Sequence, residues 1–92
     1  MAVLTDTEID ERLAGGDWRR EGATIAREWR FADFAAAIAF VERVAEVAEA
    51  ANHHPDILVH GWNKVRLTLS THSQGGVTDA DLALGQQLDA LA

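Results

Sequence analysis

Cysteine is absent from the 92-residue sequence, and this absence excludes a disulfide framework, a cysteine nucleophile and a thiolate zinc site. Basic residues are scarce as well. The sequence has 8 Lys and Arg against 15 Asp and Glu, which gives a net charge of −7 with neutral histidines. This balance argues against binding to a nucleic-acid backbone or to an anionic membrane surface. We therefore expect no direct nucleic-acid partner and no membrane partner.

Long hydrophobic runs are also absent. The longest stretch of low charge, residues 31–41, contains Asp33 and is too short to span a bilayer. The N-terminus has no cationic segment followed by an apolar run, which a secretory signal would require. The sequence thus predicts a cytoplasmic protein.

Large apolar side chains are few. Hydrophobic residues make up 48% of the 92 residues, that is 44, and 17 of them are alanine. A chain of this length has room for one core, so we expect a single domain over residues 1–92. Because that core is thin, we expect association with further copies of the chain to complete it.

Three helices are predicted from capping residues followed by apolar residues at helical spacing. They begin at Thr5, Asp33 and Thr78, and the second ends at Ala51. Four strands are predicted between the helices. Gly22 divides residues 17–31 into two short strands. The other two are residues 57–62 and 64–71, with a turn at Asn63-Lys64. Strands grouped in hairpins predict an α+β fold, with a four-stranded antiparallel sheet and helices packed on one face.

The four histidines are concentrated within 20 positions, at residues 53, 54, 60 and 72. Glu49 precedes His53 by one helical turn, so both can share a helix face. His54 and His72 are equidistant from Asn63, so a hairpin that turns there would bring them together. These spacings predict a pocket rimmed by Glu49, His53, His54 and His72, with Trp62 nearby as a flat apolar wall.

Each of these residues also has a structural interpretation. His53 could simply stabilise the C-terminus of a helix, Asp81 could be a helix N-terminal carboxylate, and Trp62 could belong to the core. His60 lies mid-strand without an evident polar partner and is expected to be structural. A metal site is a further alternative, but Glu-x-x-x-His-His is not the two-histidine helix spacing of metalloproteases.

Several segments together resemble the pterin-4a-carbinolamine dehydratases. They are Glu49-Ala-Ala-Asn-His53-His54-Pro55, Trp62-Asn63-Lys64-Val65, Leu69-Ser70-Thr71-His72, and Gly75-Gly76-Val77-Thr78 followed by Asp81. The resemblance extends upstream to Gly16-Asp17-Trp18 and to the apolar spacing of residues 31–45, so it covers nearly the whole chain.

The resemblance implies an enzyme that removes water from a 4a-hydroxytetrahydropterin to give quinonoid dihydropterin, in the cycle that regenerates tetrahydrobiopterin. The positions that match the family's catalytic histidines are His53, His54 and His72. Those that match its substrate-contacting segments are Asn52, His53, His54, Ser70, Thr71, His72 and Ser73. Glu49 and Asp81 match its acidic positions, and Trp62 stands where the family has an aromatic residue, often tyrosine.

Within this resemblance, His54 is expected to be the general acid at the leaving hydroxyl, and His53 or His72 the base at ring nitrogen N5. Glu49 is expected to orient His53. No metal, nicotinamide or flavin cofactor is expected, because nothing is oxidised overall. The expected partners are the pterin substrate and further copies of the chain, in a homodimer or homotetramer. A second interpretation is a non-catalytic, protein-binding role, since some animal members serve as dimerisation cofactors of a transcription factor.

Overall fold

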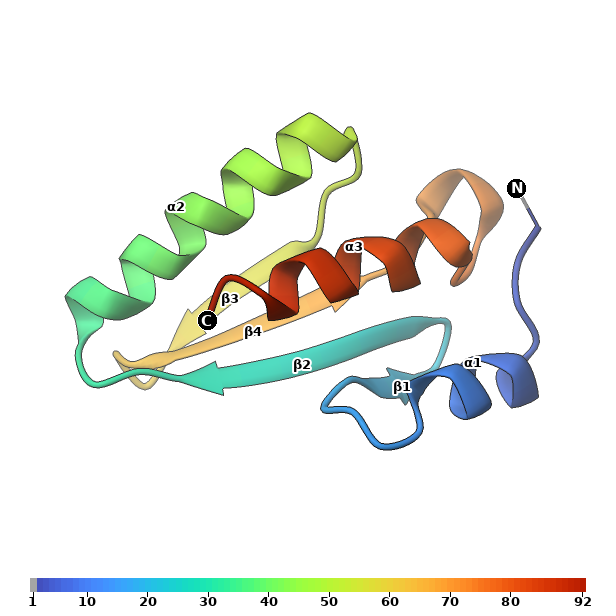
Figure 1. The fold of residues 1–92 in the computed structure, drawn as a ribbon, viewed down its shortest axis with the longest axis horizontal. Helices are drawn as coiled ribbons and strands as arrows, with labels where there is room; N and C mark the ends of the chain where they lie inside the picture. Colours follow the sequence, from blue (N-terminus) through green and yellow to red (C-terminus); the bar gives the residue numbers. More distant parts are fainter. Residues whose placement is uncertain (1) are drawn as a thin grey trace.

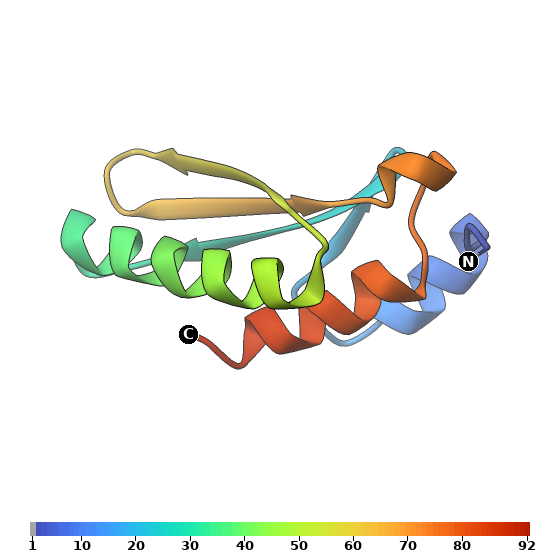
Figure 2. The same ribbon diagram turned by 90° about the horizontal axis from the view of Figure 1, so that it is seen from above.

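The computed structural model describes residues 2–92 and has the order of elements that the sequence predicts (Figure 1). The helices are α1 (Asp6–Leu13), α2 (Phe34–Ala51) and α3 (Asp79–Asp89), and a 3-10 turn, η1, covers His72–Gln74. The strands are β1 (Arg19–Glu21), β2 (Thr24–Arg30), β3 (Asp56–His60) and β4 (Lys64–Leu69). All pairs are antiparallel in the order β1-β2-β4-β3. Helices lie on one face of the sheet (Figure 2), so the predicted α+β fold is confirmed.

The helix boundaries follow the predicted caps. The Thr5 side chain accepts a hydrogen bond from the Glu8 amide while the Glu8 carboxylate accepts from the Thr5 amide, which completes a capping box. Asp33 caps α2 through the Ala36 amide at 2.7 Å. Asn52 ends α2 in the left-handed conformation, with φ of 50°.

The β3–β4 hairpin is centred on residue 62, one residue earlier than the predicted centre at Asn63. β3 ends at His60, which pairs with Lys64, so the turn consists of residues 61–63 and Trp62 lies outside the strand. Gly61 and Trp62 both have positive φ there, at 55° and 60°. Asn63 is buried and donates its side-chain amide to the Phe31 carbonyl at 2.9 Å, which fixes the turn beside the start of α2.

The core lies between the sheet and the helices. Val65, Leu67 and Leu69 of β4 are fully buried and alternate with half-buried polar residues, as period-2 patterning predicts. They pack against one apolar stripe of α2: Ala37, Phe40, Val44 and Ala48. Among residues 2–92, no helix is long and apolar enough to cross a membrane.

Arg27 lies on the same face of β2 as the buried apolar residues Ile25 and Trp29, and two contacts explain why a charge is found there. Its guanidinium bonds Asp89 of α3 at 2.6 Å and lies 4.4 Å from the centre of the Trp29 ring. The cation therefore reaches across the edge of the core to a carboxylate on α3, and the guanidinium itself lies over an aromatic ring.

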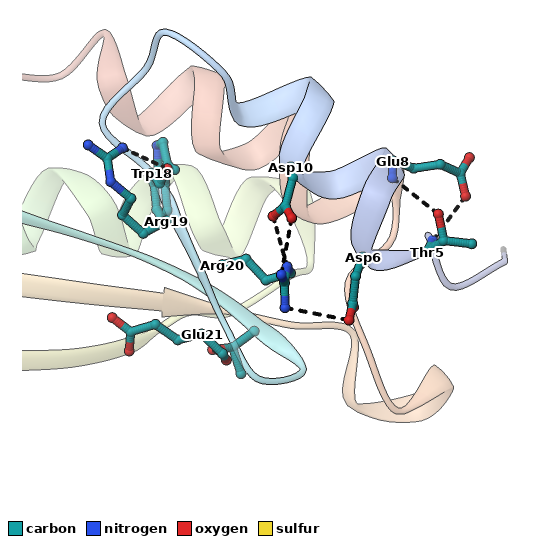
Figure 3. A network of polar contacts seen from close by, with 9 residues as sticks. Thr5, Asp6, Glu8, Asp10, Trp18, Arg19, Arg20 and Glu21 are labelled. Atoms are coloured by element: carbon teal, nitrogen blue, oxygen red, sulfur yellow. Dashed lines mark hydrogen bonds and ion pairs between the residues drawn. The ribbon is translucent and has the colours of Figure 1, made fainter.

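The N-terminal helix is held to β1 by a bidentate ion pair, which Figure 3 shows from close by. Arg20 donates to both carboxylate oxygens of Asp10, at 2.8 and 3.0 Å, and also lies 3.5 Å from Asp6. The hydrogen bond from Arg20 lowers the pKa of Asp10 below its usual value of 3.8.

We expect Asp10→Asn to lower the melting temperature at about pH 6, because it removes the charge that Arg20 binds. A lowered native pKa means that the stabilisation is present above the unfolded-state pKa and is lost as the pH falls through the native value. The difference from wild type should therefore shrink as the pH falls below the ordinary Asp10 pKa of 3.8, in thermal unfolding followed by circular dichroism. Glu11→Gln is the matched control, since Glu11 forms no ion pair among residues 2–92. A difference for Asp10→Asn that persists at low pH would contradict the ion-pair explanation.

Candidate functional site

Asp81 lies at the third position of α3 and is fully buried. One carboxylate oxygen, Oδ2, accepts hydrogen bonds from the Thr78 amide and the Thr71 hydroxyl, each at 2.9 Å. The other, Oδ1, lies 2.5 Å from Nε2 of His53. Asp81 is therefore both the helix N-terminal carboxylate that the sequence allows and the partner of a candidate catalytic histidine.

His53 is directed toward α3 by the way α2 ends. After the left-handed turn at Asn52, the His53 amide still donates to the Ala48 carbonyl at 3.1 Å. Its side chain is only 18% exposed and meets Asp81, whereas Glu49 was predicted to orient it. That prediction is wrong in this structure because the helix ends before His53, so the one-turn spacing does not place Glu49 and His53 side by side.

Glu49 instead contacts the next histidine. Its Oε1 lies 3.2 Å from Nε2 of His54, and both side chains are exposed, at 79% and 55%. Consecutive histidines thus each have a carboxylate partner, one in the protein interior and one in water. Water screens the exposed pair, so Glu49 holds His54 far less firmly than Asp81 holds His53.

His72 lies in η1, which follows β4 at the same end of the sheet as the α2–β3 connection (Figure 1). The predicted pairing of His54 with His72 is not formed. Asp56 pairs with Thr68, and continuing this register places His54 opposite Ser70, two residues before His72. The reason is the earlier turn, which moves the centre of the hairpin from residue 63 to residue 62.

The segment before and within η1 presents its polar side chains in different directions. Ser73 is exposed and Ser70 half-buried, so both are accessible at the surface. Thr71 instead turns its hydroxyl inward, to Asp81 and to Thr78 Oγ1 at 2.8 Å. The resemblance assigned Thr71 to substrate contact, but its side chain is engaged within the protein.

Trp62 and His60 lie at the other end of β3. Trp62 is 61% exposed, so it belongs neither to the core nor to a wall beside His53 in the same chain. β3 lies between His54 and Trp62 in the chain and separates them by on the order of 20 Å. Trp62 differs from its predicted place because the turn comes earlier in the chain. His60, expected to be structural, has its Nε2 2.5 Å from Glu28 Oε1 on β2. No pattern in the sequence indicated this partner, because β2 lies two strands away from β3.

None of the four histidines lines the cavity of about 180 Å³ that lies beside α1. This cavity is lined by residues of α1, β2 and α3, including Leu82 and Asp89, and by Trp18, which precedes β1. Within residues 2–92, no three His, Asp or Glu side chains are grouped as metal ligands would be. In one chain, His54 and His72 therefore lie at the surface, and His53 contacts the buried Asp81.

Comparisons with known proteins cover almost the whole chain. Residues 2–91 match the model of the family described as pterin 4 alpha carbinolamine dehydratase. A protein of Chloroflexus aurantiacus, provisionally named pterin-4-alpha-carbinolamine dehydratase, is 50% identical over 92 residues, 99% of this chain and 98% of its own. A protein of Mycobacteroides abscessus with the same provisional name is 49% identical over 90 residues, 97% of this chain and 95% of its own.

Two solved structures share the fold. A transcriptional coactivator/pterin dehydratase from Brucella melitensis superposes with a TM-score of 0.90 and 34% identity, over 98% of each chain. A pterin dehydratase-like protein identified as a RuBisCO assembly factor in the alpha-carboxysome superposes with a TM-score of 0.71 and 27% identity, over 85% of this chain and 92% of its own.

We expect Asp81→Ala to lower the free energy of unfolding by about 2–4 kcal/mol, because it leaves buried donors of Thr71 and Thr78 unpaired. Urea unfolding measures the change. Asp79→Ala is the matched control: it lies on the same helix, and its pair with Arg12 is exposed on both sides. That control should cost under about 1 kcal/mol. Equal costs for the two variants would show that Asp81 contributes only as a charge at the helix start.

Proposed function

Since this chain belongs to the pterin-4-alpha-carbinolamine dehydratase family, we propose that it removes water from a 4a-hydroxytetrahydropterin to give quinonoid dihydropterin. In the cell this step would serve the recycling of tetrahydrobiopterin. The observation that carries the proposal is the contact between His53 and buried Asp81, at a position where the chain has the family's histidines.

The chemistry needs two proton transfers and no change of oxidation state. The bond from C4a to the hydroxyl oxygen breaks, the proton on N5 is lost, and a double bond forms between C4a and N5. A group that protonates the leaving hydroxyl and a group that accepts the N5 proton are sufficient. Imidazole, with an ordinary pKa of about 6.5, can do either near neutral pH.

We assign the N5 proton to His53. With Asp81 ionised, the Nε2 proton of His53 is donated to Oδ1, which leaves Nδ1 to accept a proton. The carboxylate then stabilises the imidazolium that forms, as in other His–Asp pairs. This contact favours His53 over His72 as the base.

The general acid in this proposal is His54. Its side chain is exposed, and its Nε2 lies 3.2 Å from Glu49 Oε1, so a substrate at the surface can reach it. His72, with the exposed Ser73 and the half-buried Ser70, would contact the substrate from η1, and Asn52 from the end of α2.

We further propose that the chain forms a homodimer or homotetramer. The buried apolar side chains of α2 face the core, whereas Phe34 at the start of the helix is 56% exposed. β3 is an edge strand that exposes Ile57 and Leu58, at 40% and 53%. Exposed apolar side chains next to an unpaired strand edge are typical of a surface that another copy covers.

A protein-binding role without catalysis is the alternative. It rests on the names of the two structural neighbours, one a coactivator and the other an assembly factor. Catalysis is preferred because a purely binding surface has no need of a histidine held by a buried carboxylate. A dehydration assay decides between them, and a purified protein that does not exceed the buffer rate would refute the enzyme. The cytoplasmic location stays a prediction.

His53→Ala, His54→Ala and His72→Ala should each lower turnover of chemically generated 4a-hydroxytetrahydropterin by about 10²- to 10⁴-fold, because the first two remove a proposed proton-transfer group and the third removes a histidine that contacts the substrate. His60→Ala is the matched control and should leave turnover nearly unchanged, since the His60 ring contacts Glu28 at the other end of β3. A chelator should have no effect. The wild-type rate should change with pH at an inflection between about 5.5 and 8. Full activity of His54→Ala would refute its role as general acid.

Sedimentation velocity at micromolar concentration should give a species of at least two chains. The reason is that Phe34 of α2 and Ile57 and Leu58 of β3 are apolar and exposed. Leu58→Lys, which places a charge on the edge strand, should shift the distribution toward smaller species. A 10.0 kDa monomer at all concentrations would refute the assembly.

A further inference from the structure

A chain of hydrogen bonds ends on the carboxylate that faces His53. The Ala80 amide donates to Thr78 Oγ1 at 3.2 Å, and Thr78 Oγ1 lies 2.8 Å from Thr71 Oγ1. The Thr71 hydroxyl donates to Asp81 Oδ2 at 2.9 Å. Because a hydroxyl has one proton, Thr78 must donate to Thr71 when Thr71 donates to Asp81. The donors thus all point toward Asp81.

Thr71 also holds the turn that carries His72. Its carbonyl accepts from the amides of Gln74 and Gly75, at 2.9 and 3.0 Å, and its amide donates to the Gly76 carbonyl at 2.8 Å. One residue therefore joins the backbone of η1 to the carboxylate that contacts His53. Thr71 lies between β4 and η1, and among residues 2–92 no side chain of either element hydrogen-bonds Asp81.

We propose that Thr71 is a positioning residue of the dehydration site, which acts through Asp81 on His53 and does not contact the substrate with its side chain. This inference rests on the proposed function. The hydroxyl keeps Oδ1 of Asp81 directed at His53, and it takes part of the negative charge of the carboxylate through Oδ2. Thr71 thereby sets both the orientation of the His53 ring and the ease with which that ring releases the proton it accepts.

Loss of the hydroxyl changes the charge that His53 meets. Without Thr71 as donor, Asp81 keeps only the Thr78 amide and His53, so more negative charge remains for His53 and the pair binds a proton more tightly. The other ionisable groups on the segments joined here are Glu49 on α2, His54 in the α2–β3 connection, His72 in η1 and Asp79 on α3. None of them hydrogen-bonds Asp81.

The test compares Thr71→Val, which keeps the branched shape and removes the donor, with Thr71→Ser, which restores the hydroxyl. Thr71→Val should lower kcat by about 10- to 100-fold, as loss of a group behind a directly acting residue commonly does, and leave KM nearly unchanged. Thr71→Ser should recover most of kcat. Thr71→Ala provides the same comparison where the extra methyl of valine prevents folding.

The control variant is Thr68→Val on β4. Thr68 faces the side of the sheet away from the helices, between Ala26 and Asp56, so the same substitution there should leave kcat unchanged. Equal losses at Thr68 and Thr71 would indicate a general effect on β4 and would overturn the proposal. A rise in KM with unchanged kcat in Thr71→Val would overturn it too, because that result indicates direct substrate contact.

A second measurement does not depend on turnover. The His53 ring signals, followed by NMR without substrate, should titrate at a pH about half a unit or more higher in Thr71→Val than in wild type or Thr71→Ser. An unchanged titration would overturn the link through Asp81. If wild type has no dehydratase activity but the His53 titration moves as expected, the proposed function fails while the Thr71–Asp81–His53 link stands.

Discussion

Burial of the Asp81 carboxylate is the constraint on which the candidate site depends. A carboxylate with no exposed surface is costly unless its oxygens are hydrogen-bonded, and here the donors come from three separate segments. The Thr78 amide belongs to the start of α3, the Thr71 hydroxyl to the connection between β4 and η1, and His53 to the connection that follows α2. Because the carboxylate needs all three, it fixes the relative position of the segments that carry His53 and His72.

Environment separates the two adjacent histidines. His53 and His54 have the same side chain and each has a carboxylate partner, but Asp81 is buried and Glu49 is 79% exposed. The low-dielectric pair at His53 holds its geometry, while the pair at His54 is screened by water and free to reorganise around a substrate. In the proposed reaction, His53 would be a base of fixed geometry and His54 a mobile acid, and together they would move two protons at neighbouring atoms of one ring.

The face of the sheet that points away from the helices carries charged side chains. It is covered by ion pairs across strands, Arg66 with Glu21 and His60 with Glu28. The hydrogen bond to Glu21 raises the pKa of Arg66, so this charge is permanent. Exposed large apolar side chains lie on α2, on β3, in the β3–β4 turn at Trp62 and near the N-terminus at Val3. In the proposed assembly, α2 and the β3 edge would supply the contact between copies.

Capping residues and periodicity were enough to determine the fold from the sequence. Thr5, Asp33 and Thr78 start the helices, and the alternation in β4 identifies its buried face, because these signals depend on neighbours within a few residues. The resemblance also identified the histidines. Only the tertiary structure decided their partners. Ending α2 in a left-handed residue turned His53 from Glu49 to Asp81, and a hairpin turn centred one residue earlier moved His54 away from His72. Such contacts join residues up to 32 positions apart, and they depend on how helices and strands pack, which local patterns do not encode.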